Sequence, residues 1–265
     1  VLLCWLFKNK QVNKSYFYYL LIALSLADIW YISSEFMNLK PKKNMDKLFK
    51  SNSAIRKIQE DMDYFRVFPA DEIRSNKYSY WNIESIGGYR PIKLRNYEDL
   101  MNAKGFSRPH VLNMLNVKYV ITGKKINNTD FEKVEGIGNL YENKKVLPKA
   151  WFVGKIKNVN SQRASLMETL LSSFDPSNEA VVLNYEGPQL PNKVNGSIEV
   201  KLRKENQIIL KTNSSTGGLM VLSETYYKSG WKATINGSHS KIYQTNHILR
   251  SLYVPEGKNE IIFWY

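Results

Sequence analysis

Hydrophobic positions along the chain form one long run near its beginning and many short runs after it. The long run extends from Tyr16 to Ile32, and its seventeen residues include one serine and one acidic residue, Asp28. A helix of this length is about 25 Å long, just enough to cross a hydrocarbon core when residues at each end join it. Aromatic side chains gather at both ends of the run, as is typical at membrane interfaces. We therefore predict a transmembrane helix over residues 16–34, with a buried helix of a soluble protein as the alternative.

Apolar residues also occupy positions 1–7, and the sequence does not begin with methionine. We interpret this stretch as the end of another transmembrane helix in a longer membrane protein, rather than as the start of a chain left by signal cleavage. The link over residues 8–15 contains three lysines, and short basic loops tend to stay in the cytoplasm. This predicts a multi-pass protein of the cell membrane whose residues 35–265 are extracytoplasmic.

The residues after this helix are predicted to form two water-soluble parts. A polar linker and a short amphipathic helix are expected over residues 35–62. Over residues 63–150 the patterns of helices and strands alternate, which is typical of a small α/β domain. The strand expected over residues 117–122 is too apolar for an exposed edge, so we expect it at the centre of a sheet.

Short alternating runs, separated by turn residues, fill residues 151–265. A strand over 151–159 and a helix over 162–171 are expected first. Further strands are expected over 196–203, 206–212, 218–225, 231–235, 240–244, 247–254 and 259–265. The pair Asn236–Gly237 is a strong hairpin signal, and the spacing of the runs is typical of an antiparallel β-sandwich or jelly roll. The expected fold class is therefore α+β and membrane-anchored: a transmembrane helix, a small α/β domain and a C-terminal antiparallel β-sandwich or jelly roll.

The charge of the chain predicts an anionic neighbour. Lys and Arg number 38 against 24 Asp and Glu, a formal net charge of +14. For a protein already in a membrane, the expected partners are the lipid bilayer and an anionic envelope polymer or glycan. A lysine-rich solvated surface is the alternative. The basic residues are scattered rather than gathered into one stripe, which argues against nucleic acid. The single cysteine, Cys4, excludes an intrachain disulfide.

Candidate binding residues are aromatic. Tyr226, Tyr227 and Trp231 surround a glycine of a predicted hairpin, where their rings could stack on sugars or fill the end of the sandwich. Tyr89 follows a pair of glycines, a pattern that indicates a turn with positive φ or a backbone that a ligand approaches closely. We treat these four residues as possible contacts of a glycan or acceptor.

Motifs for catalysis or metal binding are not found in the sequence. The three histidines have no partner at ligand spacing, so no metal site is predicted. The sequence contains no glycine-rich phosphate loop, GxSxG elbow or HExxH motif. Acidic pairs are interpreted as solvated faces. We assign no catalytic residue, cofactor or metal ligand to this chain.

Residues 219–265 resemble the C-terminal extracytoplasmic segment of the bacterial YfhO family of multi-pass membrane proteins, and shorter upstream stretches resemble the same family in the same order. The stretches that carry the resemblance are Tyr64-Phe65-Arg66-Val67, Gly88-Tyr89, Leu115 to Val120, Leu147-Pro148-x-Ala150, Ser223-Glu224-x-Tyr226-Tyr227, Gly230-Trp231-Lys232-Ala233, Ile242-Tyr243, Leu249-Arg250 and Val254-Pro255-x-Gly257. One departure is Lys228, where the family usually has proline.

The resemblance implies a polytopic glycosyltransferase-C-like protein. Such a protein takes a sugar from a polyprenyl-phosphate carrier and transfers it to a cell-envelope polymer. The family's catalytic acid belongs to an early extracytoplasmic loop that this sequence does not contain, so no catalytic residue is carried over. The part seen here would overhang the reaction site and orient or select the acceptor. The alternative is a membrane-tethered carbohydrate-binding or cell-surface interaction domain without catalysis.

Overall fold

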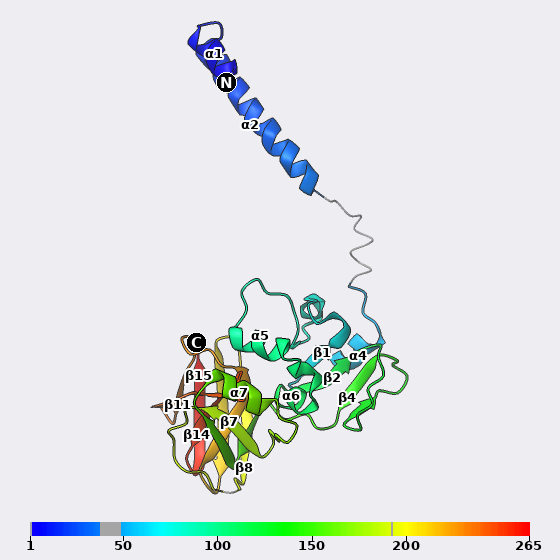
Figure 1. The fold of residues 1–265 in the computed structure, drawn as a ribbon, viewed down its shortest axis with the longest axis vertical. Helices are drawn as coiled ribbons and strands as arrows, with labels where there is room; N and C mark the ends of the chain where they lie inside the picture. The colour runs from blue at the N-terminus through cyan, green and yellow to red at the C-terminus, as the bar shows by residue number, and fades with distance from the viewer. Residues whose placement is uncertain (1, 38–48, 192) are drawn as a thin grey trace. The chain divides into compact units, whose positions relative to one another are not determined.

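The computed structural model describes residues 2–37, 49–191 and 193–265, and the chain forms two compact units, Val1–Lys50 and Ser51–Tyr265 (Figure 1). The fold is α+β. An apolar helix lies near the N-terminus, and the second unit combines a few short helices with sheets that are antiparallel or mixed.

The described residues of the first unit form the helices α1 (Leu2–Lys8) and α2 (Lys14–Phe36). Asn13 caps α2, because its side-chain oxygen accepts a hydrogen bond of 3.0 Å from a backbone N–H of the first turn. The rings of Phe7 and Phe17 stack with their centroids 4.3 Å apart, which holds α1 against the start of α2.

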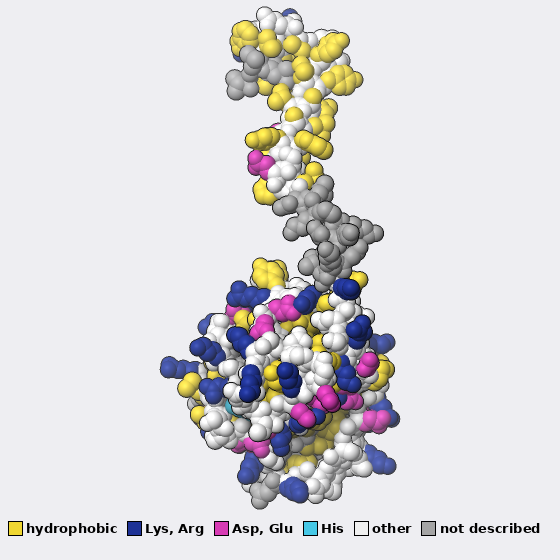
Figure 2. Space-filling view, turned by 90° about the vertical axis from the view of Figure 1, so that its right-hand side faces the viewer, with side chains coloured by type: hydrophobic (Ala, Val, Ile, Leu, Met, Phe, Trp, Pro, Cys, Tyr) yellow, Lys and Arg dark blue, Asp and Glu magenta, His cyan; other side chains and the backbone are white. Residues whose placement is uncertain are grey.

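Helix α2 confirms the predicted helix and extends it at both ends. Its 23 residues make it the one helix within the described residues that is long and apolar enough to cross a membrane. None of its side chains is buried, and Leu24 and Leu26 are each 62% exposed. Hydrophobic side chains cover its surface in Figure 2. The structure therefore gives no support to the alternative of a buried core helix.

Most of the predicted linker, residues 38–48, lies outside the described residues. The short amphipathic helix that follows is confirmed as α4 (Ser53–Glu60). The side chain of Asn52 caps it by accepting a hydrogen bond from the backbone N–H of Ile55 at 2.9 Å. Ile55 and Ile58 are buried, so α4 packs its apolar face against the rest of the second unit, to which it belongs.

Short helical segments connect the strands of the second unit. The α-helices after α4 are α5 (Arg95–Asn102), α6 (Pro109–Met114) and α7 (Gln162–Thr169), and the 3-10 helices are η1 (Ala70–Glu72), η2 (Lys77–Trp81) and η3 (Gly105–Ser107). The helix predicted over residues 162–171 is confirmed as α7, which ends two residues earlier.

A mixed four-stranded sheet has the order β1-β2-β4-β3. Its strands are β1 (Arg66–Pro69), β2 (Val117–Ile121), β3 (Phe131–Lys133) and β4 (Leu140–Asn143). Strands β1 and β2 are parallel, and the other pairs are antiparallel. Strand β2 lies between two neighbours, which confirms the central position predicted from its apolar residues.

Two further sheets follow in the chain, with the orders β5-β10-β14-β13-β7-β6 and β12-β11-β15-β9-β8. Their strands are β5 (Ala150–Val153), β6 (Lys155–Val159), β7 (Glu179–Leu183), β8 (Gly196–Arg203), β9 (Gln207–Ser214), β10 (Gly218–Thr225), β11 (Lys232–Ile235), β12 (Ser238–Ser240), β13 (Tyr243–Thr245), β14 (Leu249–Val254) and β15 (Gly257–Trp264). One apolar cluster contains residues of both sheets, with Leu210 and Phe263 from one and Leu222 and Leu252 from the other.

The prediction of a single strand over residues 151–159 is wrong. The chain forms β5 and β6 there, and these are the two edge strands of the six-stranded sheet. Because only Gly154 separates them, the two edges approach each other and the sheet must be strongly curved. The prediction of purely antiparallel pairing is also wrong for β6 and β7, which are parallel. Helix α7 connects these two strands, and a crossover of this kind places strands parallel.

The largest apolar cluster joins residues from the 63–150 and 151–265 parts of the sequence. Leu112 and Val117 contribute from the first part, and Val181, Val221 and Leu249 contribute from the second. These parts therefore pack against each other within one compact unit.

Candidate functional site

A cavity of about 1040 Å³, the large cavity, lies in the second unit. The segment 73–94 forms much of its wall, and residues of β1, α5, β8, β10 and β14 contribute to the rest. Five cationic side chains and three carboxylates line it: Arg66, Arg74, Arg90, Lys93 and Arg203, with Glu84, Glu98 and Glu224. The lining therefore carries more positive than negative charge.

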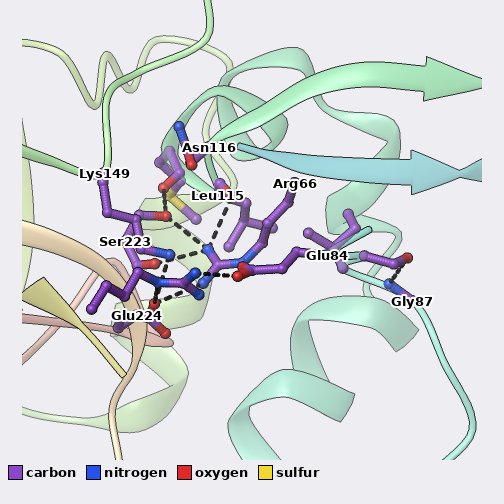
Figure 3. A network of polar contacts seen from close by, with 12 residues as sticks. Arg66, Glu84, Gly87, Leu115, Asn116, Lys149, Ser223 and Glu224 are labelled. Carbon is purple, nitrogen blue, oxygen red and sulfur yellow. Dashed lines mark hydrogen bonds and ion pairs between the residues drawn. The ribbon is translucent and has the colours of Figure 1, made fainter. Parts of the chain in front are cut away.

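Arg66 is the side chain that connects the two parts of the second unit (Figure 3). It stands at the start of β1, and its Nη1 donates hydrogen bonds to the backbone oxygens of Leu115 at 3.2 Å and Ser223 at 2.8 Å. The same nitrogen donates to the hydroxyl of Ser223 at 3.1 Å. Its Nη2 pairs with Glu224 at 3.2 Å, and its Nε lies 3.7 Å from Glu84. The planar guanidinium thus holds β1 and β10 in one arrangement.

Glu224, near the end of β10, is a carboxylate shared by three cations. Its Oε1 lies 2.6 Å from Nζ of Lys149, 3.2 Å from Nη2 of Arg66 and 3.6 Å from Nε of Arg203. Burial alone would raise its pKa, but the attraction of the three cations outweighs burial and holds the pKa at about 2. Glu224 is therefore ionised throughout the physiological range.

Lys149 is the most buried cation of this network, at 5% exposure. Burial lowers its pKa to about 8, and the repulsion of Arg66 acts in the same direction, while Glu224 opposes both. Its backbone oxygen accepts a hydrogen bond of 2.8 Å from the N–H of Ser223, which fixes Lys149 beside β10.

The network as a whole has an excess of positive charge. Arg203 also pairs with Glu84, so three cations (Arg66, Lys149 and Arg203) face two carboxylates (Glu84 and Glu224). Both carboxylates and both arginines line the cavity. An anionic group in the cavity would meet a site that is already short of negative charge.

The glycine pair before Tyr89 includes the positive φ that the sequence predicted, and it packs closely against the chain's own backbone, whereas the approach of a ligand stays a prediction. Gly88 has a φ of +124°, which only glycine adopts without strain. A Cβ on Gly87 would lie 2.3 Å from the backbone oxygen of Ile73, so the backbone passes too close for any side chain. The N–H of Tyr89 donates to the side-chain oxygen of Asn76 at 2.7 Å, and its ring is 61% exposed at the cavity.

Tyr226, Tyr227 and Trp231 line a second, smaller hollow of about 320 Å³. The structure thus brings three of the four candidate aromatic residues together and places Tyr89 at the other hollow. Trp231 is partly buried against the core of the two C-terminal sheets, whereas Tyr227 is 42% exposed. Trp231 therefore packs as one of the two interpretations predicted, while the stacking of these rings on sugars stays a prediction.

Sequence reasoning gave no role to the residues of the charged network. Arg66, Ser223 and Glu224 occur in the stretches quoted for the family resemblance, and Lys149 lies between Pro148 and Ala150 of another. These residues lie far apart in the chain, so no local sequence pattern indicates that they are in contact. Within the described residues, no group of three or more His, Cys, Asp or Glu side chains is placed to hold a metal ion.

The sequence matches no protein-family model, and no curated protein or solved structure matches it. The resemblance to the YfhO family accordingly stays a prediction.

Proposed function

We propose that the second unit binds a phosphate-bearing glycan in the large cavity, as the extracytoplasmic part of a multi-pass membrane glycosyltransferase of the YfhO type. In this proposal the complete protein transfers a sugar from a polyprenyl-phosphate carrier to a cell-envelope polymer. Residues 35–265 lie outside the cytoplasm, and the C-terminal sheets act as a β-sandwich or jelly roll that faces the acceptor. The observation that carries the proposal is the excess of cationic side chains in a cavity large enough for several sugar units.

The chemistry of the cavity suits a sugar phosphate. Guanidinium groups bind phosphate oxygens in pairs, and Arg74 and Arg90 line the cavity without belonging to the Arg66 network. Tyr78, Tyr89 and Tyr97 also line it, and tyrosine rings can pack on the apolar face of a sugar. Glycan and phosphate therefore each have matching side chains.

Glu224 acts in binding rather than in proton transfer. A general acid or base works best with a pKa near the operating pH. Glu224, with a pKa of about 2 and three cationic partners, is far from that condition. We therefore assign it to holding Arg66 and Arg203 in place at the cavity, and the proposal places the catalytic acid outside residues 1–265.

Binding is tested by titrating the 265-residue chain, in a nonionic detergent, with a short-chain prenyl-phosphate-linked hexose. The variant Arg74→Gln/Arg90→Gln is expected to bind about tenfold more weakly, because two charge-assisted contacts are lost. The matched control is Arg56→Gln/Arg163→Gln, which removes two exposed arginines outside both hollows. Equal binding of the phosphate-free glycoside, or an equal effect of the control, contradicts the proposal.

The transferase activity is tested separately, by glycan analysis of the envelope from a strain that lacks the complete gene. The proposal expects loss of one sugar substituent. An unchanged glycan profile together with intact glycan binding favours the second candidate, a membrane-tethered carbohydrate-binding domain without catalysis. The same cavity supports that candidate. It predicts a single membrane anchor before the domain, whereas the transferase proposal predicts about ten upstream spans and an acidic residue in the first outer loop.

A further inference from the structure

The smaller hollow lies beside the large cavity but is lined by different residues. Thr225 and Leu249 are partners in the β10–β14 pair, and both line the large cavity. The next residue along each segment, Tyr226 and Arg250, lines the smaller hollow. The two hollows therefore lie at the same ends of β10 and β14. Because they have no lining residue in common, a substitution in one hollow can leave the other unchanged.

Positive charge dominates the lining of the smaller hollow. Four cationic side chains take part, Lys228, Lys232, Lys241 and Arg250, and its lining contains no Asp or Glu. Lys241 pairs with Glu186 at 2.5 Å. The other three cations form no ion pair with any residue that the structure describes. This hollow thus has a larger uncompensated charge than the large cavity, where carboxylates accompany the arginines.

Arg250 is the residue that most needs an additional partner. It is 2% exposed, yet its Nε and Nη1 donate no hydrogen bond within the described part of the chain. Its guanidinium carbon lies 4.0 Å from the centroid of the Trp231 ring and 5.8 Å from that of Phe263. Contact with the rings offsets part of the cost of burying the charge, but buried donors without acceptors remain unfavourable.

Aromatic rings form one side of the same hollow. Trp231 stacks on Arg250, and Tyr227 lies with its ring within 10° of parallel to that of Tyr265, with centroids 6.4 Å apart. Gly230 lets the rings approach, because a Cβ there would lie 2.2 Å from the ring of Tyr265 and 2.7 Å from that of Tyr227. Exposed flat rings next to unpaired cations suit a ligand that has both an apolar face and an anionic group.

We propose that the smaller hollow binds an anionic saccharide, with a sugar ring against Tyr227 and Trp231 and its phosphate or carboxylate group facing Lys228, Lys232 and Arg250. This site goes beyond the proposed function, since it does not depend on the large cavity. The second unit would then contact an envelope polymer at two neighbouring places. Such bivalent contact strengthens binding to a long polymer without any tighter single site.

The experiment titrates the 265-residue chain, in a nonionic detergent, with three oligosaccharides of equal length: one with phosphodiester links, one made of uronic acids and one neutral. We expect at least one anionic oligomer to bind and the neutral one to bind much more weakly. The variant Lys228→Gln/Lys232→Gln is expected to weaken binding about tenfold, and Tyr227→Ala to weaken it as well. The anionic oligomer that binds more tightly identifies the anionic group.

Matched controls separate this site from general charge and from the large cavity. Lys204→Gln/Lys211→Gln removes two exposed lysines outside both hollows and should leave binding unchanged. The variant Arg74→Gln/Arg90→Gln changes the large cavity only. It should leave the binding of a short oligomer at the smaller hollow unchanged, even where it weakens the binding of the prenyl-linked hexose. An equal effect of the lysine control, equal binding of the neutral oligomer, or failure of both anionic oligomers to bind overturns the proposal.

Discussion

Glu224 holds three cations together with a side chain that is 18% exposed. Its contacts show how a basic chain can bury positive charge: Lys149 and Arg66 stay close to each other because one carboxylate lies between them. Removing one partner of a buried ion pair leaves the other charge buried without compensation. The resulting loss of stability is larger than the net stability that the intact pair contributes.

The first prediction follows from this network. Glu224→Gln should lower the free energy of unfolding by roughly 3–5 kcal/mol, because Lys149 and Arg66 lose their shared carboxylate. Urea unfolding of the two chains measures the difference. Glu205→Gln, an exposed carboxylate outside the network, is the control and should change stability by less than about 0.5 kcal/mol. Equal stability of the Glu224 variant and the parent chain would contradict the assigned role.

The second prediction concerns pH. The pKa of Glu224 is about 2 in the folded chain, below its ordinary value of 4.5. Its contribution is therefore complete above pH 4.5 and is lost as the pH falls towards 2. At about 1.4 kcal/mol per pKa unit, the loss amounts to roughly 3–4 kcal/mol. Unfolding between pH 6 and pH 2 should show a flatter pH dependence for Glu224→Gln than for the parent chain, and parallel curves would refute this.

The third prediction tests the turn before Tyr89. Gly87→Ala should destabilise the second unit by about 1–3 kcal/mol, because the new Cβ would meet the backbone oxygen of Ile73 at 2.3 Å. Thermal unfolding measures the change. The control is Gly138→Ala, where a Cβ meets nothing within 4 Å. Similar melting temperatures for both variants would show that the segment adjusts easily.

At the scale of elements, the hairpin between β11 and β12 formed where its turn residues predicted it. Asn236 and Gly237 have φ values of 49° and 82°, as a two-residue turn with positive φ at both positions requires. The side-chain oxygen of Asn236 also accepts a hydrogen bond of 2.8 Å from the N–H of Glu260, which ties the turn to β15.

The fourth prediction belongs to this hairpin. Gly237→Ala should cost about 1–2 kcal/mol of stability, since a side chain there disfavours the left-handed conformation. Ser238→Ala, one residue later and equally exposed, is the control and should have little effect. Chemical unfolding measures the stability of both variants. A larger loss for Ser238→Ala than for Gly237→Ala would exclude the turn conformation as the cause.

At the scale of the whole molecule, α2 and the second unit have opposite surfaces. α2 exposes apolar side chains along its length, while Lys, Arg, Asp and Glu side chains are scattered among other polar atoms over the visible face of the second unit (Figure 2). This contrast suits a chain that lies partly in lipid and partly in water.

The fifth prediction tests this division. The chain should remain with the membrane after alkaline extraction. Leu24→Arg should shift it towards the soluble fraction, because an arginine at the centre of a span costs about 3 kcal/mol. Leu24→Ile is the matched control and should remain with the membrane. Release of the parent chain by alkaline extraction would remove the basis for membrane anchoring.

Local patterns account for the elements that the sequence predicted well. The apolar run over α2 and the Asn236–Gly237 turn each depend on residues close together in the chain, so both can be recognised in the sequence. The break at Gly154, between the two edge strands of one sheet, depends on pairing with distant strands, and the sequence pattern missed it.

The sequence by itself determined the apolar helix, the excess of positive charge and most strand positions, because periodicity and composition act locally. Only the tertiary structure decided that Arg66 meets Glu224 across 158 positions of the chain and that Lys149 is buried beside them. It also decided that Arg250 lies under Trp231, with no acceptor among the described residues for two of its donor nitrogens. Ion pairing and burial depend on distances in space, and those are set by how the sheets pack rather than by the order of the residues.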